Sequence, residues 1–404
     1  MAIYPNQPSE VTVRLLERKS NTIIEDITPM VRYVNFTEKL RRSGFGKLEV
    51  LSEDLSLESR QAIINGNASI QVIRDTVEVR PQGDNQNYTD EFSGPVVIAR
   101  LKDGDFINQK LDFTTVRNEI VVLGNNTGAS RAVTRVASSS SQSNIGMREL
   151  IVDGRNTSTS AERTALANAT LTESLEVARV ISAGGRSKGN LVFELAFADN
   201  KIYMNYRHIG CTGVATIDPG NVKAGNYIRS ILNDNLITPQ SAGHDNAANR
   251  QIDVPATIGT YDGVGGDVDM PLRWNNLSSA VEQACYLGEV GITSTVNDSN
   301  QIVYTVIPQN DRTSGTTNGV VWNRDNSEAS WDVRVGDKIT VEEYLSTTSS
   351  SPEIEPADFV CVGRSINMQR GREDVVNLEI GGEVQALNDQ LKRQFKTINT
   401  AQYV

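Results

Sequence analysis

Residues 222–313 of this 404-residue chain order their predicted elements in a way that restricts the fold more than any other segment. A short amphipathic helix in NVKAGNYIRSILNDNL precedes a polar loop, a second amphipathic helix in LRWNNLSSAVEQACYLGEVGI and an edge-like strand in YTVIPQNDRT. A helix with a single apolar face must bury that face against another element. The order therefore predicts one small subdomain in which two helices pack together, closed by a strand.

Both helices have recognisable ends as well as apolar faces. The first, predicted over residues 226–236, cannot continue through Pro239, which has no backbone N–H to donate. Its shared face consists of Tyr227, Ile228, Ile231 and Leu232. In the second helix, Asn276 can cap the start and Gly288 lies just past the end. Its apolar stripe consists of Leu277, Val281, Ala284 and Cys285.

The chain before this subdomain is predicted to be rich in β-strands between residues 10 and 124. Apolar and polar residues alternate over 11–15, 47–50 and 69–72, as they do in strands with one buried face. A short helix is predicted between the last two of these strands, and Gly66 is placed to end it. The apolar residues that fit one face of this helix are Leu57, Ile63 and Ile64.

Two β-hairpins and one fully buried strand are also predicted. The runs LDFTTV and EIVVLG flank Arg117 and Asn118, and the runs LVFELAF and KIYMNYRHI flank Asp199 and Asn200. Residues 96–98, in contrast, are all apolar without alternation, which predicts a strand buried on both faces.

The block over residues 136–221 is predicted to begin with a linker and continue with a helix. Residues 138–146 are almost all Ser, Gln, Asn and Gly, which favours a solvated loop. From residue 160 to 181 the apolar spacing is helical, with Thr172 as a candidate N-cap. We interpret the block as an insertion between two parts of a larger framework.

The last part of the chain returns to strand-like alternation. The runs VRVGDKITV, FVCVGRSI and VVNLEIGG predict three strands, with a flexible loop at STTSSSP. Beyond them, apolar residues recur at near-helical steps in a charged tail: Leu387, Leu391, Phe395 and Ile398. This stripe could pack onto its own domain or dock onto a neighbouring subunit, and the sequence leaves both alternatives open.

Charge and composition exclude several classes of protein. A formal net charge of −11 and a longest basic cluster of only Lys39-Leu40-Arg41-Arg42 argue against binding to nucleic acid through phosphates. The chain has three cysteines, and an odd number of widely separated cysteines argues against a disulfide framework. The N-terminal sequence has no secretory signal, and no apolar run is long enough to span a membrane.

No residue pattern predicts catalysis. His208 and His244 have no second His or Cys at metal-ligand spacing, and neither a nucleophile elbow nor a phosphate-binding glycine loop occurs. We therefore assign no catalytic, cofactor-binding or metal-binding residue and expect no cofactor. Carboxylate pairs for sugar hydrolysis stay open as an alternative, because the many acidic residues offer pairings that the sequence does not rank.

One acidic loop has two interpretations. Asp262, Asp267 and Asp269 lie close together among glycines, and such carboxylates can bind calcium. The spacing and the terminal glutamate of an EF-hand loop are missing. A glycine-rich turn before the second helix is the preferred interpretation, and the metal alternative is left open.

Taken in order, these motifs resemble the tail-hub proteins of siphoviruses. The motifs of the second half are GNYIRSILNDNL, Arg250, LRWNNLSSAVEQACYLG, the DRT of Asp311-Arg312-Thr313, Val335-Gly336-Asp337 and Glu379-Ile380-Gly381. Those of the first half are Gly46-Lys-Leu-Glu-Val, the helix ending at Gly66, SIQVIRD, Phe92-Ser-Gly94, Val121-Val-Leu-Gly124 and Arg131.

The resemblance implies a structural protein of the virion, made in the host cytoplasm, and not an enzyme. It implies a homotrimeric ring at the distal end of a tail, through which DNA passes without being specifically bound. The implied partners are the distal tail or tail-tube protein, the tape measure protein and the tip or fibre proteins. Two alternatives remain: a carbohydrate-binding or glycan-hydrolysing tail protein, and the hub of a contractile tail or injection system.

The fold class implied is mainly β with small α+β subdomains, in β-barrel-like hub domains. We divide the chain into five segments, which begin with a β-barrel-like N-terminal domain and an inserted linker, helix and hairpin region. A helical α+β subdomain, a C-terminal β domain and an amphipathic tail follow. Their bounds are 1–135, 136–221, 222–313, 314–383 and 384–404.

Overall fold

The fold is known from a computed structural model of the chain. It describes residues 11–76, 87–103, 107–127, 130–184, 190–210, 219–239, 250–308, 310–311, 321–322, 333–346, 353–369 and 375–380.

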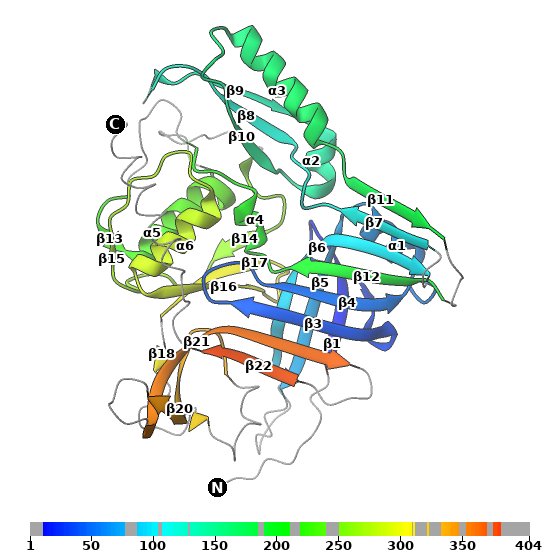
Figure 1. Ribbon diagram of the computed structural model, residues 1–404, viewed down its shortest axis with the longest axis vertical. Coiled ribbons are helices and arrows are strands. Elements are labelled where there is room, and N and C mark those ends of the chain that lie inside the picture. Colours follow the sequence, from blue (N-terminus) through cyan, green and yellow to red (C-terminus); the bar gives the residue numbers. More distant parts are fainter. Residues whose placement is uncertain are drawn as a thin grey trace.

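A single 14-stranded sheet dominates the fold, which is mainly β as the sequence predicts (Figure 1). Its strands are β1 Val11–Glu17, β2 Ile23–Asp26, β3 Val31–Lys39, β4 Phe45–Leu51, β5 Ala68–Thr76, β6 Asn87–Asp103, β7 Ile107–Asp112, β11 Ala178–Ala183, β12 Val192–Ala198, β18 Asn310–Asp311, β19 Val321–Trp322, β20 Asp337–Ser346, β21 Glu353–Gln369 and β22 Val375–Ile380. It takes strands from segments 1–135, 136–221, 222–313 and 314–383, so the segment bounds do not separate independent sheets.

The long strand β6 folds this sheet into two layers. Residues 87–95 of β6 pair with β5, which continues through β1 to β2. Residues 96–103 pair instead with β12 and β7, from which the sheet continues to β4, β3 and β21 on one side and β11 on the other. Figure 1 shows the β1 and β5 layer behind the layer of β3, β4 and β12.

The core between the layers is aromatic at its centre. Phe92 lies 5.1 Å from Phe36 and 5.2 Å from Phe197, measured between ring centroids, and all three side chains are buried. Tilted and edge-on ring pairs of this kind add about 0.5–1.5 kcal/mol each beyond the area they bury. Val96 and Val97 are each 2 % exposed and belong to different apolar clusters, which confirms the predicted strand with two buried faces.

A second, three-stranded sheet lies beside the first. It orders β10 Glu149–Asp153, β8 Glu119–Leu123 and β9 Val133–Ala137, and helix α3 Ser160–Ser174 covers one face. Ile120, Val122, Ala167 and Leu171 form the core between helix and sheet. The short helix α2 Ser139–Ile145 joins β9 to β10.

The third unit is the helical subdomain that the opening segment predicts. It contains α5 Ala224–Leu232, the π-helical turn η3 Asn233–Ile237, α6 Leu277–Leu287 and the short α4 Ile202–Asn205. Around the helices lie β13 Val222–Lys223 with β15 Asp267–Val268, and the sheet of β14 Ala256–Ile258, β17 Ile302–Pro308 and β16 Val290–Val296.

Most details of this subdomain are confirmed. The Asn276 side chain accepts a hydrogen bond from the Ser279 backbone N–H at the start of α6, and Gly288 is the C-cap. All eight apolar side chains predicted for the two helices are buried in one cluster. The prediction that the closing strand lies at a sheet edge is wrong. Strand β17 lies in the middle of its sheet, because β14 pairs with it on one side and β16 on the other.

Both predicted hairpins are wrong. β7 pairs with β6 and β11, whereas β8 belongs to the three-stranded sheet, because the buried Asn118 anchors the connection between them. Its amide donates to the Gly146 carbonyl and accepts from the Arg148 N–H. After β12 the chain turns into helix α4, since Asp199 accepts the Lys201 N–H at 3.1 Å and starts a helical turn.

Three helix predictions need correction. The polar run at 138–146 forms α2, because the Ser138 hydroxyl caps its first turn. Helix α3 begins at the cap Thr159 and ends at Ser174, so Thr172 lies inside it and residues 178–181 belong to β11. Helix α1 Leu57–Ile64 exists, and Gly66 follows it with φ +72°. Of its three predicted apolar contacts only Ile63 is buried, whereas Leu57 and Ile64 are 66 % and 49 % exposed, because a helix of two turns presents one narrow stripe to the sheet.

The three late strands are confirmed as β20, β21 and β22. The STTSSSP loop beyond Ser346 and the tail stripe at 387–398 lie outside the described residues. In the part of the chain that the structure describes, no helix has the length and apolar character to cross a membrane.

Candidate functional site

The most unusual chemistry of the described residues is a set of charged side chains buried where the three units meet. Arg250, a marker of the family resemblance, is 0 % exposed. Its Nε donates to Glu149 Oε1 at 3.1 Å, and its Nη2 donates to the His208 carbonyl. The pair joins the helical subdomain to the first residue of β10.

Glu149 is the centre of a group that we call the junction cluster: Glu149, Arg250, Arg135, Arg207 and His208. Arg135 Nη1 lies 3.4 Å from Glu149 Oε1, and the His208 N–H donates to Oε2 at 2.8 Å. Burial by itself would raise the pKa of Glu149, but the arginines and this N–H outweigh it and lower the pKa to about 2. Burial lowers the pKa of Arg207 to about 10. Glu149 and Arg207 are therefore both charged at neutral pH.

A second pair, in which Arg18 is buried and the Asp253 side chain is 29 % exposed, joins the large sheet to the helical subdomain. Arg18, directly after β1, donates from Nη1 and Nη2 to the two oxygens of Asp253 at 2.9 and 2.6 Å. Its Nη2 also donates to the Asn144 carbonyl in α2. A bidentate guanidinium pair fixes orientation as well as distance. Arg18 therefore contacts the other two units from the large sheet.

A third group lies within the large sheet. Arg364 of β21 is 0 % exposed and donates to Glu91 of β6 at 2.5 Å and to Glu38 of β3 at 2.8 Å. Arg334 binds the same Glu91 through both of its terminal nitrogens, at 2.6 and 2.9 Å. These contacts attach the chain before β20 and the strand β21 to strands from the first quarter of the sequence.

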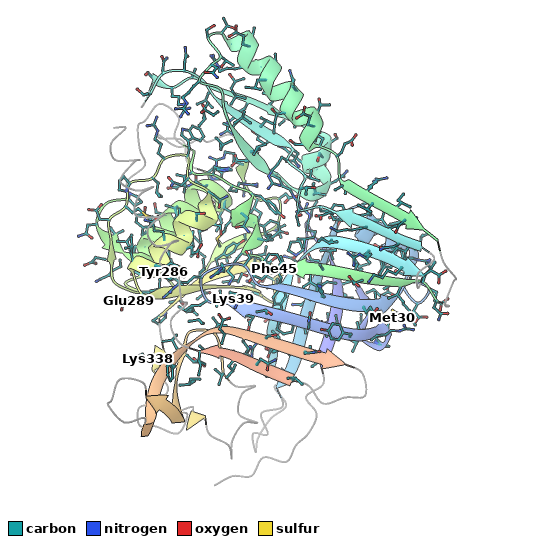
Figure 2. All side chains as sticks on the ribbon, in the orientation of Figure 1. Met30, Lys39, Phe45, Tyr286, Glu289 and Lys338 are labelled. Carbon is teal, nitrogen blue, oxygen red and sulfur yellow. The ribbon has the colours of Figure 1, made fainter. Side chains whose placement is uncertain are left out.

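A fourth set of contacts joins the end of β3 to the helical subdomain, near Lys39 and Tyr286, which are labelled in Figure 2. Lys201 Nζ donates to the carbonyls of Lys39 and Ile292, at 2.6 and 3.2 Å, and lies 3.3 Å from Asp199. On the other side of this contact, the Arg41 guanidinium stacks 4.2 Å above the Tyr286 ring. Strand β3 and its continuation are thereby attached to β16 and α6.

Asp199 is the carboxyl group in this region that most resembles a catalytic acid, because burial raises its pKa. Its oxygens, however, accept backbone N–H groups from Gly44 at 2.8 Å and Lys201 at 3.1 Å. These bonds shape the turn after β12, which gives the residue a structural role.

Of the histidines and cysteines considered in the sequence, the structure describes His208, Cys285 and Cys361. His208 contributes its backbone to the junction cluster, and burial lowers the pKa of its imidazole, while His244 lies outside the described residues. Cys285 and Cys361 are buried, and burial raises the pKa of the Cys361 thiol to about 12. Cys211 lies outside the described residues.

The three acidic side chains of the 262–269 loop are not grouped like metal ligands. Asp262, Asp267 and Asp269 are all exposed, and Asp267 pairs with Lys223 at 3.0 Å as β15 aligns with β13. Over the described ranges, no three His, Cys, Asp or Glu side chains are grouped in a way that could hold a metal ion.

The buried ion pairs join segments that are distant in sequence, and sequence reasoning singled out only Arg250 among them. Four of the other residues adjoin or lie within an apolar strand-forming run: Glu149, Arg18, Glu91 and Arg364. A charged residue in such a run is the signal that could have indicated a buried pair, because an unpaired buried charge is prohibitively costly.

Comparison of the sequence with protein-family models finds no match, and none of the curated proteins matches it. The solved structures similar to the chain include tail proteins of phages and components of type VI secretion systems.

The tail protein from Neisseria meningitidis MC58 matches 94 % of this chain and 98 % of its own, with 9 % identity and a TM-score of 0.39. The E. coli c3393 protein, a type VI secretion component that exhibits structural similarity to the T4 tail proteins gp27 and gp5, matches 93 % of this chain and 75 % of its own, with 8 % identity and a TM-score of 0.33. The 43 kDa tail protein of prophage MuSo2 from Shewanella oneidensis matches 92 % and 97 %, with 8 % identity and a TM-score of 0.30. TM-scores in this range do not establish a common fold.

Proposed function

We propose that this chain is a structural component of a phage tail tip. In this proposal it forms the baseplate or tail hub, a homotrimeric ring that connects the tail tube or distal tail ring to the host-facing tip. DNA passes through the ring during ejection and is not specifically bound. The ring would contact the tape measure protein and the tip or fibre proteins.

The observation that carries the proposal is the use of the buried charges. In the junction cluster, Glu149 is held ionised between arginines, and the buried acids Glu91 and Asp199 are bound by arginines or by backbone N–H groups. Such pairs fix the position of one unit against another. A rigid connection between units suits a protein that transmits force within an assembly. The order of motifs resembling siphovirus hubs supports the same proposal.

Charge is consistent with a DNA-conducting ring. The formal net charge of −11 disfavours adhesion of a polyanion to the protein as a whole. A closed ring also buries strand edges that would otherwise pair without control.

Electron microscopy of the purified protein tests the proposal. We expect closed rings with threefold symmetry and a central opening. Single copies or open filaments at every concentration would overturn it.

The alternatives are distinguished by incubating the protein with purified peptidoglycan or capsular polysaccharide. Release of reducing sugar would favour a glycan hydrolase, and binding without release would favour a carbohydrate-binding module. Hubs of contractile tails or injection systems would give the same rings, so a sheath around the intact particle in electron micrographs would separate them from the siphovirus hub.

A further inference from the structure

Strand β11 is an exposed edge of the large sheet. It pairs antiparallel with β7, and among the described residues no strand pairs with its other side. Residues 178–182 are all exposed, with Val180 at 59 % and Ile181 at 69 %. These two neighbours point to opposite faces of the strand, so the described part of the chain covers neither face of β11 at these positions. Figure 1 shows β11 at the rim of the molecule.

Strand β22 forms another rim of the same sheet. It pairs antiparallel with β21, and in the described part of the chain its second side also has no partner strand. One of its faces is partly buried, through Val376, Leu378 and Ile380, while Val375, Asn377 and Glu379 are exposed. An unpaired edge of this kind is a template for a further strand.

The directions of β11 and β22 allow them to pair antiparallel between two copies of the chain. The path from β11 through β7, β6, β12, β4, β3 and β21 to β22 contains only antiparallel pairs. Eight alternating strands leave β11 and β22 running in opposite directions. If neighbouring copies are related by a rotation about an axis roughly parallel to the strands, each strand keeps its direction. Strand β22 of one copy then lies antiparallel to β11 of the next.

Length and charge also match. Both strands have six residues. Strand β11 has the exposed cation Arg179, and β22 has Glu379, which pairs with Lys39 and is still 55 % exposed. Opposite charges on facing strands favour pairing, whereas like charges oppose it.

We propose that β11 of one copy pairs antiparallel with β22 of the next copy, so that the large sheet continues from protomer to protomer. This inference rests on the ring assembly proposed above and specifies its interface. The contact is heterologous, because each copy uses two different edges, and repetition of such a contact closes a ring when the rotation permits. Pairing of β11 with itself would instead give a two-fold dimer in which no β11 edge is left for a third copy.

Chemical cross-linking tests the pairing. Val180→Cys and Asn377→Cys are prepared separately and together, and each protein is treated with a short bismaleimide, with the wild type as the background for its native cysteines. We expect covalent species of two and three chains from the double variant, and none above background from either single variant. Cross-linking of Val180→Cys alone would show self-pairing of β11 and overturn the proposal, and absence of cross-links in the double variant would overturn it as well.

A charge placed on the edge gives an independent readout. The variant V180K/I181K puts two lysines on β11, as natural edge strands do to prevent pairing. We expect the concentration of half-assembly to rise by at least about tenfold, with an unchanged circular dichroism spectrum. The control Leu57→Lys changes a residue that is 66 % exposed on α1 and should leave assembly unchanged.

The two proposals can fail separately. Rings that persist in V180K/I181K would refute the β11 interface and leave the hub assembly intact. A wild-type protein that stays monomeric would refute both.

Discussion

Glu149 and Arg250 form an ion pair of 3.1 Å between two side chains that are 1 % and 0 % exposed. They are 101 positions apart in sequence and belong to the three-stranded sheet and the helical subdomain. Removal of two charges from water is costly unless each has a partner and further hydrogen bonds. The pair therefore favours one arrangement of the two units, because any other arrangement loses this contact between two buried charges.

The first prediction concerns this pair. Arg250→Met removes the cation and leaves Glu149 buried without it, so the free energy of unfolding should fall by about 3–5 kcal/mol. Denaturant titration followed by circular dichroism measures the change. The exposed pair of Arg155 and Asp153 supplies the control, and Arg155→Met should cost less than about 1 kcal/mol. Equal losses in the two variants would contradict the role of burial.

The second prediction is a pH dependence. The pKa of Glu149 is about 2 in the folded protein against the usual 4.5, so the unfolded chain binds the proton more tightly. The stability contributed by the ionised carboxylate is complete above pH 4.5 and is lost as the pH falls towards 2. The difference in unfolding free energy between wild type and Glu149→Gln should therefore shrink over this range. A difference that stays constant with pH would contradict the depressed pKa.

The third prediction tests the contact of Arg18 with Asp253. A double-mutant cycle with Arg18→Met and Asp253→Asn compares the losses of unfolding free energy. The sum of the two single losses should exceed the loss in the double variant by about 0.5–3 kcal/mol. The reason is that either substitution already breaks the bidentate pair. Strictly additive losses would show that the two side chains do not stabilise each other.

The fourth prediction explains a glycine of the GNYIRSILNDNL motif. A Cβ at Gly225 would lie 1.8 Å from the Tyr261 carbonyl oxygen, so helix α5 and the loop after β14 approach too closely for any side chain. Gly225→Ala should lower stability by about 1–3 kcal/mol through overpacking. Gly266→Ala is the matched control, because its Cβ would meet nothing nearer than 3.6 Å. A thermal unfolding midpoint lowered equally by both substitutions would argue against the close approach.

The helical subdomain could be predicted from sequence because its information is local. The cap Asn276, the stripe from Leu277 to Cys285 and Gly288 all lie within four turns of chain, and each acts on its own helix. The alternating strands were predictable for the same reason. Their order in the sheet was not, because β12 lies between β4 and β6, and no local pattern in its sequence encodes those neighbours.

The errors have a common physical cause, which is that tertiary contacts decide between local alternatives. The runs flanking Arg117 and Asn118 are both strands, but the buried Asn118 sends them to different sheets. The serine-rich run becomes α2 because the adjoining Ile145 packs into the core. The junction cluster shows the same limit, since Glu149 acquires its role only when Arg250 is brought to it by the fold.

Residues outside the described ranges leave several predictions as they were. Asp311 ends β18, which pairs parallel with β20, whereas Arg312 and Thr313 lie outside those ranges. The two interpretations of the tail stripe at 387–398 both stand as predictions.

Gly336, in the Val335-Gly336-Asp337 motif, has φ +100°, a conformation that favours glycine.

The molar mass of the purified full-length protein, measured by light scattering over a range of concentrations, tests the account most directly. A closed ring of three copies predicts a mass of three times 44.2 kDa that does not increase further with concentration. A mass of one chain at every concentration would contradict the account, and so would a mass that grows without limit.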